Sequence, residues 1–271
     1  MKRTPIWCLI LMVALVLVVT GCGQSTPESP QEAVEEKVAE LSLAGTSWEV
    51  ESFGGPDDTV PVLPDVRPTV NYLVERYAGS GGCNWYVGVY STDGSSLRMQ
   101  TPATTRTICE LPEVNEQEAL FMTSLLNVTE YKIEGDKLMA YTVEDQLLVT
   151  FVPLQPVPVE GTTWILKFIY NGKEWQPAIP GSPVTAQFEG DQMSGLAGCN
   201  TYQAAVTIEG ETMTIGEAAS TRKACAEPEG VMDQETMLLS MLPSVAGYAT
   251  AGHALALLDA DGQAILMFGV E

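Results

Sequence analysis

Gly82-Cys83-Asn84-Trp85-Tyr86 returns 116 residues later as Gly198-Cys199-Asn200-Thr201-Tyr202. The same offset (199 − 83) relates Thr105-Arg106-Thr107-Ile108-Cys109 to Thr221-Arg222-Lys223-Ala224-Cys225. Separated motifs that recur in the same order at one spacing mark a duplicated domain.

The repeat extends on both sides of these motifs. Gly45-Thr46-Ser47-Trp48 matches Gly161-Thr162-Thr163-Trp164 at the same offset, and further along the offset becomes 117, which aligns Glu118 with Glu235. Two domains of about 110 residues are each large enough to bury a core. The sequence therefore predicts five parts: a leader at 1–21, a tether at 22–42, domains at 43–153 and 159–271, and a proline-rich linker at 154–158.

The N-terminus has the features of a secretory signal. Lys2 and Arg3 precede an apolar run over 6–19, which is short for a membrane span. The following Val19-Thr20-Gly21-Cys22 resembles the lipobox of bacterial lipoproteins, in which cleavage leaves the cysteine as the lipid-carrying first residue. We expect a lipid anchor at Cys22 on the extracytoplasmic side of a membrane. The alternative is an ordinary secreted protein in which Cys22 is incidental.

The residues after Cys22 are polar and contain proline, so residues 23–30 are expected to form a tether. Ser29 and Glu32 have the spacing of a capping box, which predicts a short helix from about Pro30 to Leu41.

The cysteines favour an oxidising compartment. Cys8 lies in the leader, so apart from Cys22 four cysteines remain, two in each domain. Three pairings are possible, and a domain that folds alone favours Cys83–Cys109 and Cys199–Cys225. Closing a loop of that size would stabilise each domain by roughly 3–4 kcal/mol. The alternative is four buried free thiols, which an exported protein makes less favourable.

The charge of the chain excludes nucleic acid as a partner. Without the leader, 11 basic and 35 acidic residues give a net charge of −24, and these charges are spread along the chain. The single histidine, His253, aligns with Asp136 at a hairpin and is predicted to be an exposed turn residue. We find no nucleophile, metal or phosphate motif, so we expect no catalytic residues, metal or cofactor, and no enzyme activity.

Each repeat is dominated by short strand patterns and carries one helical pattern. A helix is predicted over 112–128 and again over 228–245, where apolar residues follow helical spacing. Alternating β-branched and aromatic residues between Gly, Asp and Pro turns predict the strands of the first copy. These strands are 47–53, 69–76, 85–90, 97–101, 129–133, 137–143 and 146–151. The fold class is therefore mainly β (α+β), with each domain a curled antiparallel sheet or partial barrel closed by a helix.

These motifs in this order resemble the META domain, also called the HslJ-like or DUF306 family. The resemblance covers nearly the whole mature chain, from about 43–153 and 159–271. It implies an envelope or secreted protein linked to stress tolerance or virulence, with no established catalytic activity. The fold is similar to that of pilot lipoproteins of type III secretion, whose small barrels hold a lipid-sized apolar cavity.

The shared motif residues are expected to support the scaffold. Arg106 and Arg222 would pair with Glu118 and Glu235 to hold the helix to the sheet. The alternative is that the asparagine, arginine and glutamate form a polar ligand pocket. The motif residues are Gly82, Asn84, Tyr86, Thr105, Arg106 and Glu118 in the first copy, and Gly198, Asn200, Tyr202, Thr221, Arg222 and Glu235 in the second.

The two copies differ in one strand. Residues 85–90 keep a glycine and two aromatic residues that 201–206 lack, so the first copy is the better candidate for binding. Trp175, which has no aromatic counterpart, is either a core residue or an exposed anchor. We expect a lipid-anchored envelope protein that binds an apolar ligand or assists the assembly of envelope proteins. The alternative is a structural or protein-interaction module with filled barrels. These two functions are distinguished by whether the inward-facing side chains leave a cavity in the barrel or fill it. The positions are Tyr72, Val74, Val89 and Phe121.

Overall fold

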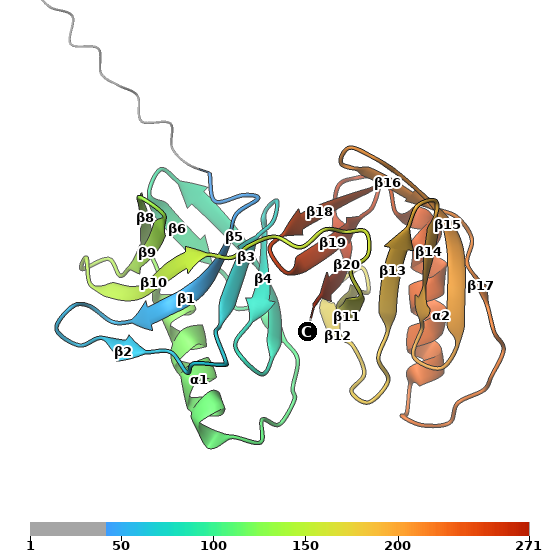
Figure 1. Ribbon diagram of the computed structural model, residues 1–271, viewed down its shortest axis with the longest axis horizontal. Coiled ribbons are helices and arrows are strands. Elements are labelled where there is room, and N and C mark those ends of the chain that lie inside the picture. The colour runs from blue at the N-terminus through green and yellow to red at the C-terminus, as the bar shows by residue number, and fades with distance from the viewer. Residues whose placement is uncertain (1–41, 271) are drawn as a thin grey trace, which may run out of the picture. The chain divides into compact units, whose positions relative to one another are not determined.

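A computed structural model of the chain describes residues 42–270 (Figure 1). The predicted leader, the Cys22 anchor, the tether and the helix at 30–41 lie outside these residues. In the described part, no helix is both long and apolar enough to cross a membrane.

The first domain is a closed antiparallel barrel of eight strands, because the last strand, β10, pairs with the first, β1. A short strand β2 (Val60–Pro61) pairs with β1, another, β7 (Ala103–Thr104), pairs with β5, and one helix, α1 (Pro112–Asn127), lies between β7 and β8 in the chain. The barrel strands are β1 (Ser47–Phe53), β3 (Thr69–Tyr72), β4 (Arg76–Ser80), β5 (Trp85–Asp93), β6 (Ser96–Met99), β8 (Glu130–Glu134), β9 (Lys137–Tyr141) and β10 (Leu147–Pro153).

The second domain repeats this topology and closes by pairing β11 with β20. Its accessory elements are β12 (Trp175–Pro177), β17 (Ala219–Ser220), α2 (Val231–Met241) and a 3-10 turn, η1 (Leu242–Ser244). The barrel strands are β11 (Trp164–Tyr170), β13 (Thr185–Glu189), β14 (Gln192–Leu196), β15 (Thr201–Glu209), β16 (Thr212–Ile215), β18 (Gly247–Ala251), β19 (Ala254–Leu258) and β20 (Ala264–Gly269). The predicted fold class is confirmed, and closure leaves neither barrel with a free edge between its first and last strands.

One predicted strand is wrong. The stretch 69–76 is not continuous: the chain turns between β3 and β4, with Glu75 in the left-handed region at φ 56°. Leu73-Val74-Glu75-Arg76 contains no glycine or proline to indicate the turn. Val74 accordingly lies outside the barrel with 67% of its surface exposed, although the sequence placed it inside.

Side chains fill the interior of barrel 1. Phe121 of α1 is fully buried, with its ring centroid 5.9 Å from that of Tyr86 and 6.5 Å from those of Phe53 and Phe151. Tyr72 is also buried. An eight-stranded barrel has an interior just wide enough for side chains to fill, and these rings occupy it.

An apolar core separate from the two barrel interiors joins the barrels. Apolar side chains on the outside of β11, β18, β19 and β20 pack against the β3–β4 turn and the outside of β4 and β5. The buried members are Leu73, Ala78 and Val87 from barrel 1 and Phe168, Ala251, Ala254, Ala256, Ala264 and Met267 from barrel 2. Both faces of β19 and β20 are thus covered, and the linker amide of Val157 donates to the carbonyl of Gly252 (3.1 Å).

Candidate functional site

The two predicted disulfides are confirmed. Cys83–Cys109 and Cys199–Cys225 form within their own barrels, with Cα atoms 5.9 and 6.0 Å apart. Each joins the start of the motif strand to the loop that precedes the helix. Disulfides of this kind suggest an oxidising, extracytoplasmic compartment.

Beside the first disulfide, the carboxylate of Glu118 receives two hydrogen bonds from Asn84. The backbone amide of Asn84 donates to Oε1 (2.7 Å) and its side-chain nitrogen to Oε2 (2.9 Å). The amide oxygen of Asn84 accepts from the hydroxyl of Thr105 (3.0 Å) and the backbone amide of Thr107 (2.7 Å). Helix, strand and loop are therefore joined through one asparagine.

Barrel 2 contains the same network. Glu235 accepts from the backbone and side-chain nitrogens of Asn200, both at 2.8 Å. Asn200 accepts from Thr221 (2.7 Å) and from the amide of Lys223 (2.7 Å). Glu235 is 5% exposed, so these donors take the place of water around its carboxyl oxygens.

The predicted pairing of arginine with glutamate does not form. Arg106 and Arg222 are exposed, and no ion pair in residues 42–270 joins either of them to Glu118 or Glu235. The motif asparagine of each barrel donates hydrogen bonds to the glutamate carboxylate instead, because its backbone and side-chain N–H groups point at the helix. The alternative of a shared polar pocket of asparagine, arginine and glutamate is likewise not assembled by this geometry.

The motif glycine and tyrosine have structural roles that fit the scaffold expectation. Gly82 and Gly198 adopt φ values of 117° and 103°, where a side chain would be strained. The hydroxyl of Tyr86 donates to the carbonyl of Thr69, and that of Tyr202 donates to Thr185 (2.9 Å). Burial raises the pKa of both tyrosines, so both remain neutral donors.

A glutamine before each motif glutamate was missed by the sequence reasoning. Gln117 accepts from the amide of Leu63 (2.7 Å) and donates to the carbonyl of Val66 (2.7 Å), which holds the long loop before β3 to α1. Gln234 accepts from the amide of Ile179 (2.7 Å) in the same way. The recurrence of Gln-Glu at aligned positions was the signal that could have identified the pair.

One group of side chains has the spacing of a metal site. Among the described residues, Cys83, Cys109 and Glu118 place ligand atoms within 4.8 Å of one another. The two sulfurs are bonded to each other, and Glu118 is engaged by Asn84. The donor set therefore provides no thiolate and does not fit a metal ion.

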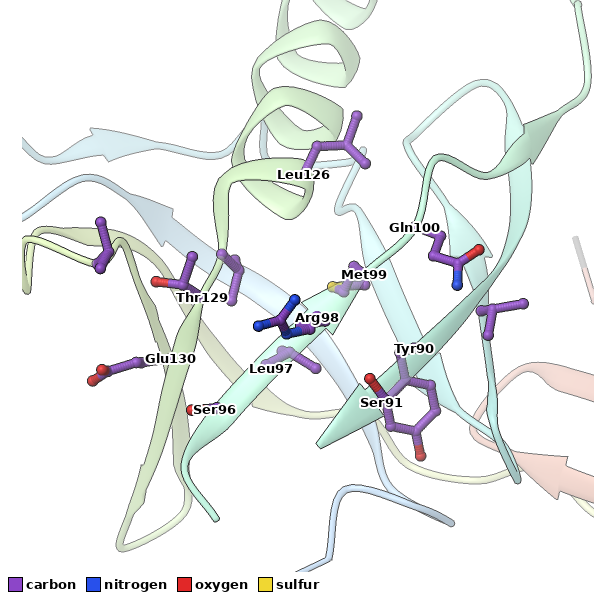
Figure 2. A pocket seen from close by; sticks show the side chains of 13 residues that line it. Tyr90, Ser91, Ser96, Leu97, Arg98, Met99, Gln100, Leu126, Thr129 and Glu130 are labelled. Carbon is purple, nitrogen blue, oxygen red and sulfur yellow. The ribbon is translucent and has the colours of Figure 1, made fainter. Parts of the chain in front are cut away.

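Barrel 1 carries a groove where the seam between β6 and β8 opens (Figure 2). These strands pair at a single position, Ser96 with Glu130, and the groove has a volume of about 710 Å³. Figure 2 shows Leu126 on the last turn of α1 above Arg98 and Met99 of β6. The lining combines apolar with polar side chains: Val89, Tyr90, Leu97, Met99, Leu126, Val128 and Val143, with Ser91, Ser96, Arg98, Gln100, Thr129 and Glu130.

The differences between the two copies now have separate physical causes. Gly88 stands opposite Tyr77, and a Cβ at Gly88 would come within 2.4 Å of that ring. In barrel 2 the same pair is Ala204 and Met193, a thinner side chain that leaves room for a methyl group. The glycine is therefore a packing requirement of barrel 1.

The aromatic residue lost from the start of the strand belongs to the interface. Trp85 packs against barrel 2, whereas its counterpart Thr201 is exposed. The presence of Trp85 in the first copy is thus explained by contact with the second domain. It is therefore weaker evidence that the first copy binds a ligand.

Two further aromatic residues lie near the same interface. Trp175 is half-buried, 5.4 Å from the ring of Tyr170 and 5.9 Å from the guanidinium carbon of Arg76, so it is neither a core residue nor an exposed anchor. His253 lies in the β18–β19 turn as predicted, but it is half-buried, and burial lowers its pKa from 6.5 against the opposing effect of Glu49.

Comparison with known proteins identifies one family, and it is not a family of known catalytic activity. No curated protein matches the chain. An NMR structure of a protein from Burkholderia xenovorans is 24% identical over 48% of this chain and 97% of its own, with a TM-score of 0.36. A crystal structure of a DUF4847 family protein from Bacteroides vulgatus is 17% identical over 42% of this chain and 95% of its own, with a TM-score of 0.31.

The family comparison covers nearly all of the described chain. The META domain profile matches twice, at residues 41–155 and 157–271. Each match contains one closed barrel with its helix and its Asn-Glu network. The chain belongs to the META domain family, with two copies of the domain in tandem.

Proposed function

We propose that this protein is a lipid-anchored, extracytoplasmic, non-catalytic binding protein whose first barrel holds an apolar or amphipathic ligand. The observation that carries this proposal is the groove of about 710 Å³ between β6 and the end of α1. Its volume is within the range of small-molecule sites, which runs from about 300 to 1,000 Å³.

The chemistry of the groove supports an amphipathic ligand. Leu126 and Val143 line it with 42% and 72% of their surfaces exposed, which leaves apolar area open to solvent. Arg98 and Glu130 add polar groups that could orient a headgroup. The aligned positions in barrel 2 are Thr214 and Gly247, so these charges are specific to the first copy.

The proposed location rests on the N-terminal sequence and the disulfides. Val19-Thr20-Gly21-Cys22 predicts lipidation, and two disulfides fit an oxidising compartment. Replacing Cys22→Ser should move the protein from the membrane fraction to the soluble extracytoplasmic fraction. Unchanged membrane retention of the variant would contradict the anchor.

The ligand is tested on the released Cys22→Ser protein, recovered from its own host without detergent. Native mass spectrometry followed by organic extraction should detect a co-purifying apolar molecule. Leu126→Glu with Val143→Glu should abolish it, because both changes place charge in the groove at exposed positions that do not support the core. Val60→Glu, another exposed apolar position away from the groove, is the matched control.

A second function is supported by the filled barrel interior. The rings of Phe121, Tyr86 and Phe151 occupy the space that a cavity would need. An apo mass for the released protein, with nothing extracted, would overturn the groove ligand and favour a protein-interaction module.

A further inference from the structure

The two barrels form a cleft of about 610 Å³ whose walls come from both of them. Barrel 1 contributes Trp85, Thr105 and Arg106 from the motif strand and its loop, and barrel 2 contributes Lys167 of β11 and the loop 177–184. This cleft depends on the tandem arrangement, because the motif residues of barrel 1 form one wall and residues of barrel 2 form the other.

The charge of the cleft is opposite to that of the protein. Among the described residues, the lining includes Arg106 and Lys167 and no carboxylate, although the chain has 35 acidic and 13 basic residues. Acidic residues line three other grooves: Glu130 lines the groove between β6 and β8, Glu75 and Asp261 line a second groove, and Asp259 lines a third. A cleft lined by one sign of charge concentrates ions of the other sign.

The guanidinium of Arg106 is available for a ligand. No ion pair or side-chain hydrogen bond found within residues 42–270 engages it. Guanidinium presents a planar set of N–H donors that matches the oxygens of a carboxylate or phosphate. Beside it, the ammonium of Lys167 lies 4.8 Å from the centre of the Trp85 ring, so the cleft pairs cations with an aromatic surface.

The wall on the side of barrel 2 contains buried polar atoms without a partner. Ser182 lines the cleft and is 2% exposed, and its hydroxyl has no hydrogen bond. Behind this wall, the side-chain nitrogen of Gln234, which does not line the cleft, also has no partner among the described residues, although the equivalent nitrogen of Gln117 donates to the carbonyl of Val66. Both unpaired atoms lie near Gly198, since a Cβ there would be 2.6 Å from the hydroxyl and 3.8 Å from the amide nitrogen. Unpaired buried polar groups cost free energy, so a hydrogen-bonding partner at this wall would be stabilising.

We propose that the inter-barrel cleft binds a small organic anion. Its carboxylate or phosphate group is held by Arg106. Its apolar part lies against Trp85 and the prolines of the loop 177–184. This site is separate from the groove of barrel 1 and does not depend on the function proposed for that groove.

The test uses three small aromatic probes on the released Cys22→Ser protein. Benzoate and phenyl phosphate carry the two candidate anionic groups, and benzamide is the uncharged analogue. Binding is measured by calorimetry and by the change in tryptophan emission. Whichever anion binds more tightly identifies the group, and benzamide should bind at least tenfold more weakly because it lacks the charge that Arg106 recognises.

Variants assign the site. Arg106→Gln should weaken anion binding about tenfold or more, since a charge-assisted bidentate contact is lost. Arg222→Gln removes the same motif arginine from barrel 2, where it does not line this cleft, so this variant should bind like the parent.

Three results would overturn the proposal: no anion binds at millimolar concentrations, benzamide binds as tightly as benzoate, or Arg222→Gln weakens binding as much as Arg106→Gln. Because both arginines are exposed, the two variants should fold, and thermal unfolding is the check.

Discussion

The indole ring of Trp85 in barrel 1 lies directly against Gly269 in barrel 2. A Cβ at Gly269 would stand 2.1 Å from Cη2 of Trp85, closer than any real contact. The aligned residue in barrel 1 is Val152, so a valine suits this position in the barrel itself. The glycine is therefore required by the neighbouring domain and not by the strand.

Gly269→Val should separate the barrels while leaving each one folded. The valine fits β20 but displaces Trp85, which breaks the apolar core between the domains. Small-angle scattering should show a larger radius of gyration, and tryptophan emission should shift to the red. Gly216→Val is the control, because its nearest atoms beyond its own chain neighbours are 3.7 Å from the added Cβ. Scattering identical to that of the parent would show that Trp85 does not hold the domains together.

Glu118→Gln should destabilise barrel 1 by about 1–3 kcal/mol, because an amide turns one acceptor oxygen into a donor facing Asn84. Glu235→Gln should cost barrel 2 at least as much, since Glu235 is more deeply buried. Denaturant unfolding measures both.

The control for these variants is Glu116→Gln, an exposed position on the same helix as Glu118. If Glu116→Gln lost as much stability as Glu118→Gln, the hydrogen bonds between Asn84 and Glu118 would not be what stabilises barrel 1. Arg106→Gln should leave stability unchanged, because its guanidinium has no carboxylate partner in the described chain.

Barrel 1 should lose stability above about pH 10. Burial raises the pKa of Tyr90 to about 12, and it also raises those of Tyr72, Tyr77 and Tyr86. A raised pKa means that the neutral form is favoured in the folded state. Its contribution is complete below the unfolded value of about 10 and is lost as the pH rises toward 12.

Denaturant midpoints measured from neutral to alkaline pH, together with phenolate absorbance, test this alkaline dependence. Tyr90→Phe should flatten part of it. Midpoints that stay constant through pH 11 would show that these hydroxyls are not protected from titration.

The contact between the barrels should weaken in acid. His253 is the single histidine and lies in the hairpin that meets barrel 1, where burial lowers its pKa from 6.5. A lowered pKa favours the neutral ring in the folded state, so this contribution is present above pH 6.5 and is lost as the pH falls through the folded value.

An NMR titration of the imidazole signals measures this pKa without assignment, because one histidine is present. We expect a value below 6.5 in the parent and a return toward 6.5 in Gly269→Val, where the hairpin is released. Equal values in both proteins would show that the interface does not bury the ring.

Local patterns in the sequence were sufficient for the architecture of each domain. Motif spacing identified two copies, and the position of Cys83 and Cys109 in one copy selected the pairing, because a domain that folds alone must close its own disulfide. Period-two alternation gave β1 over its full length, and helical spacing gave α1 to within one residue. The turn at Glu75 was not predicted, because no glycine or proline marks it in the sequence.

Contacts between distant residues were decided only by the tertiary structure. The sequence paired Glu118 with Arg106 by charge, but the fold presents Asn84 to the carboxylate first. The sequence alone established the duplication and the content of each barrel, since those depend on spacing and periodicity along the chain. The structure decided that the barrels close, that Trp85 meets Gly269 and that Arg106 faces a cleft, because each depends on which surfaces pack together in space.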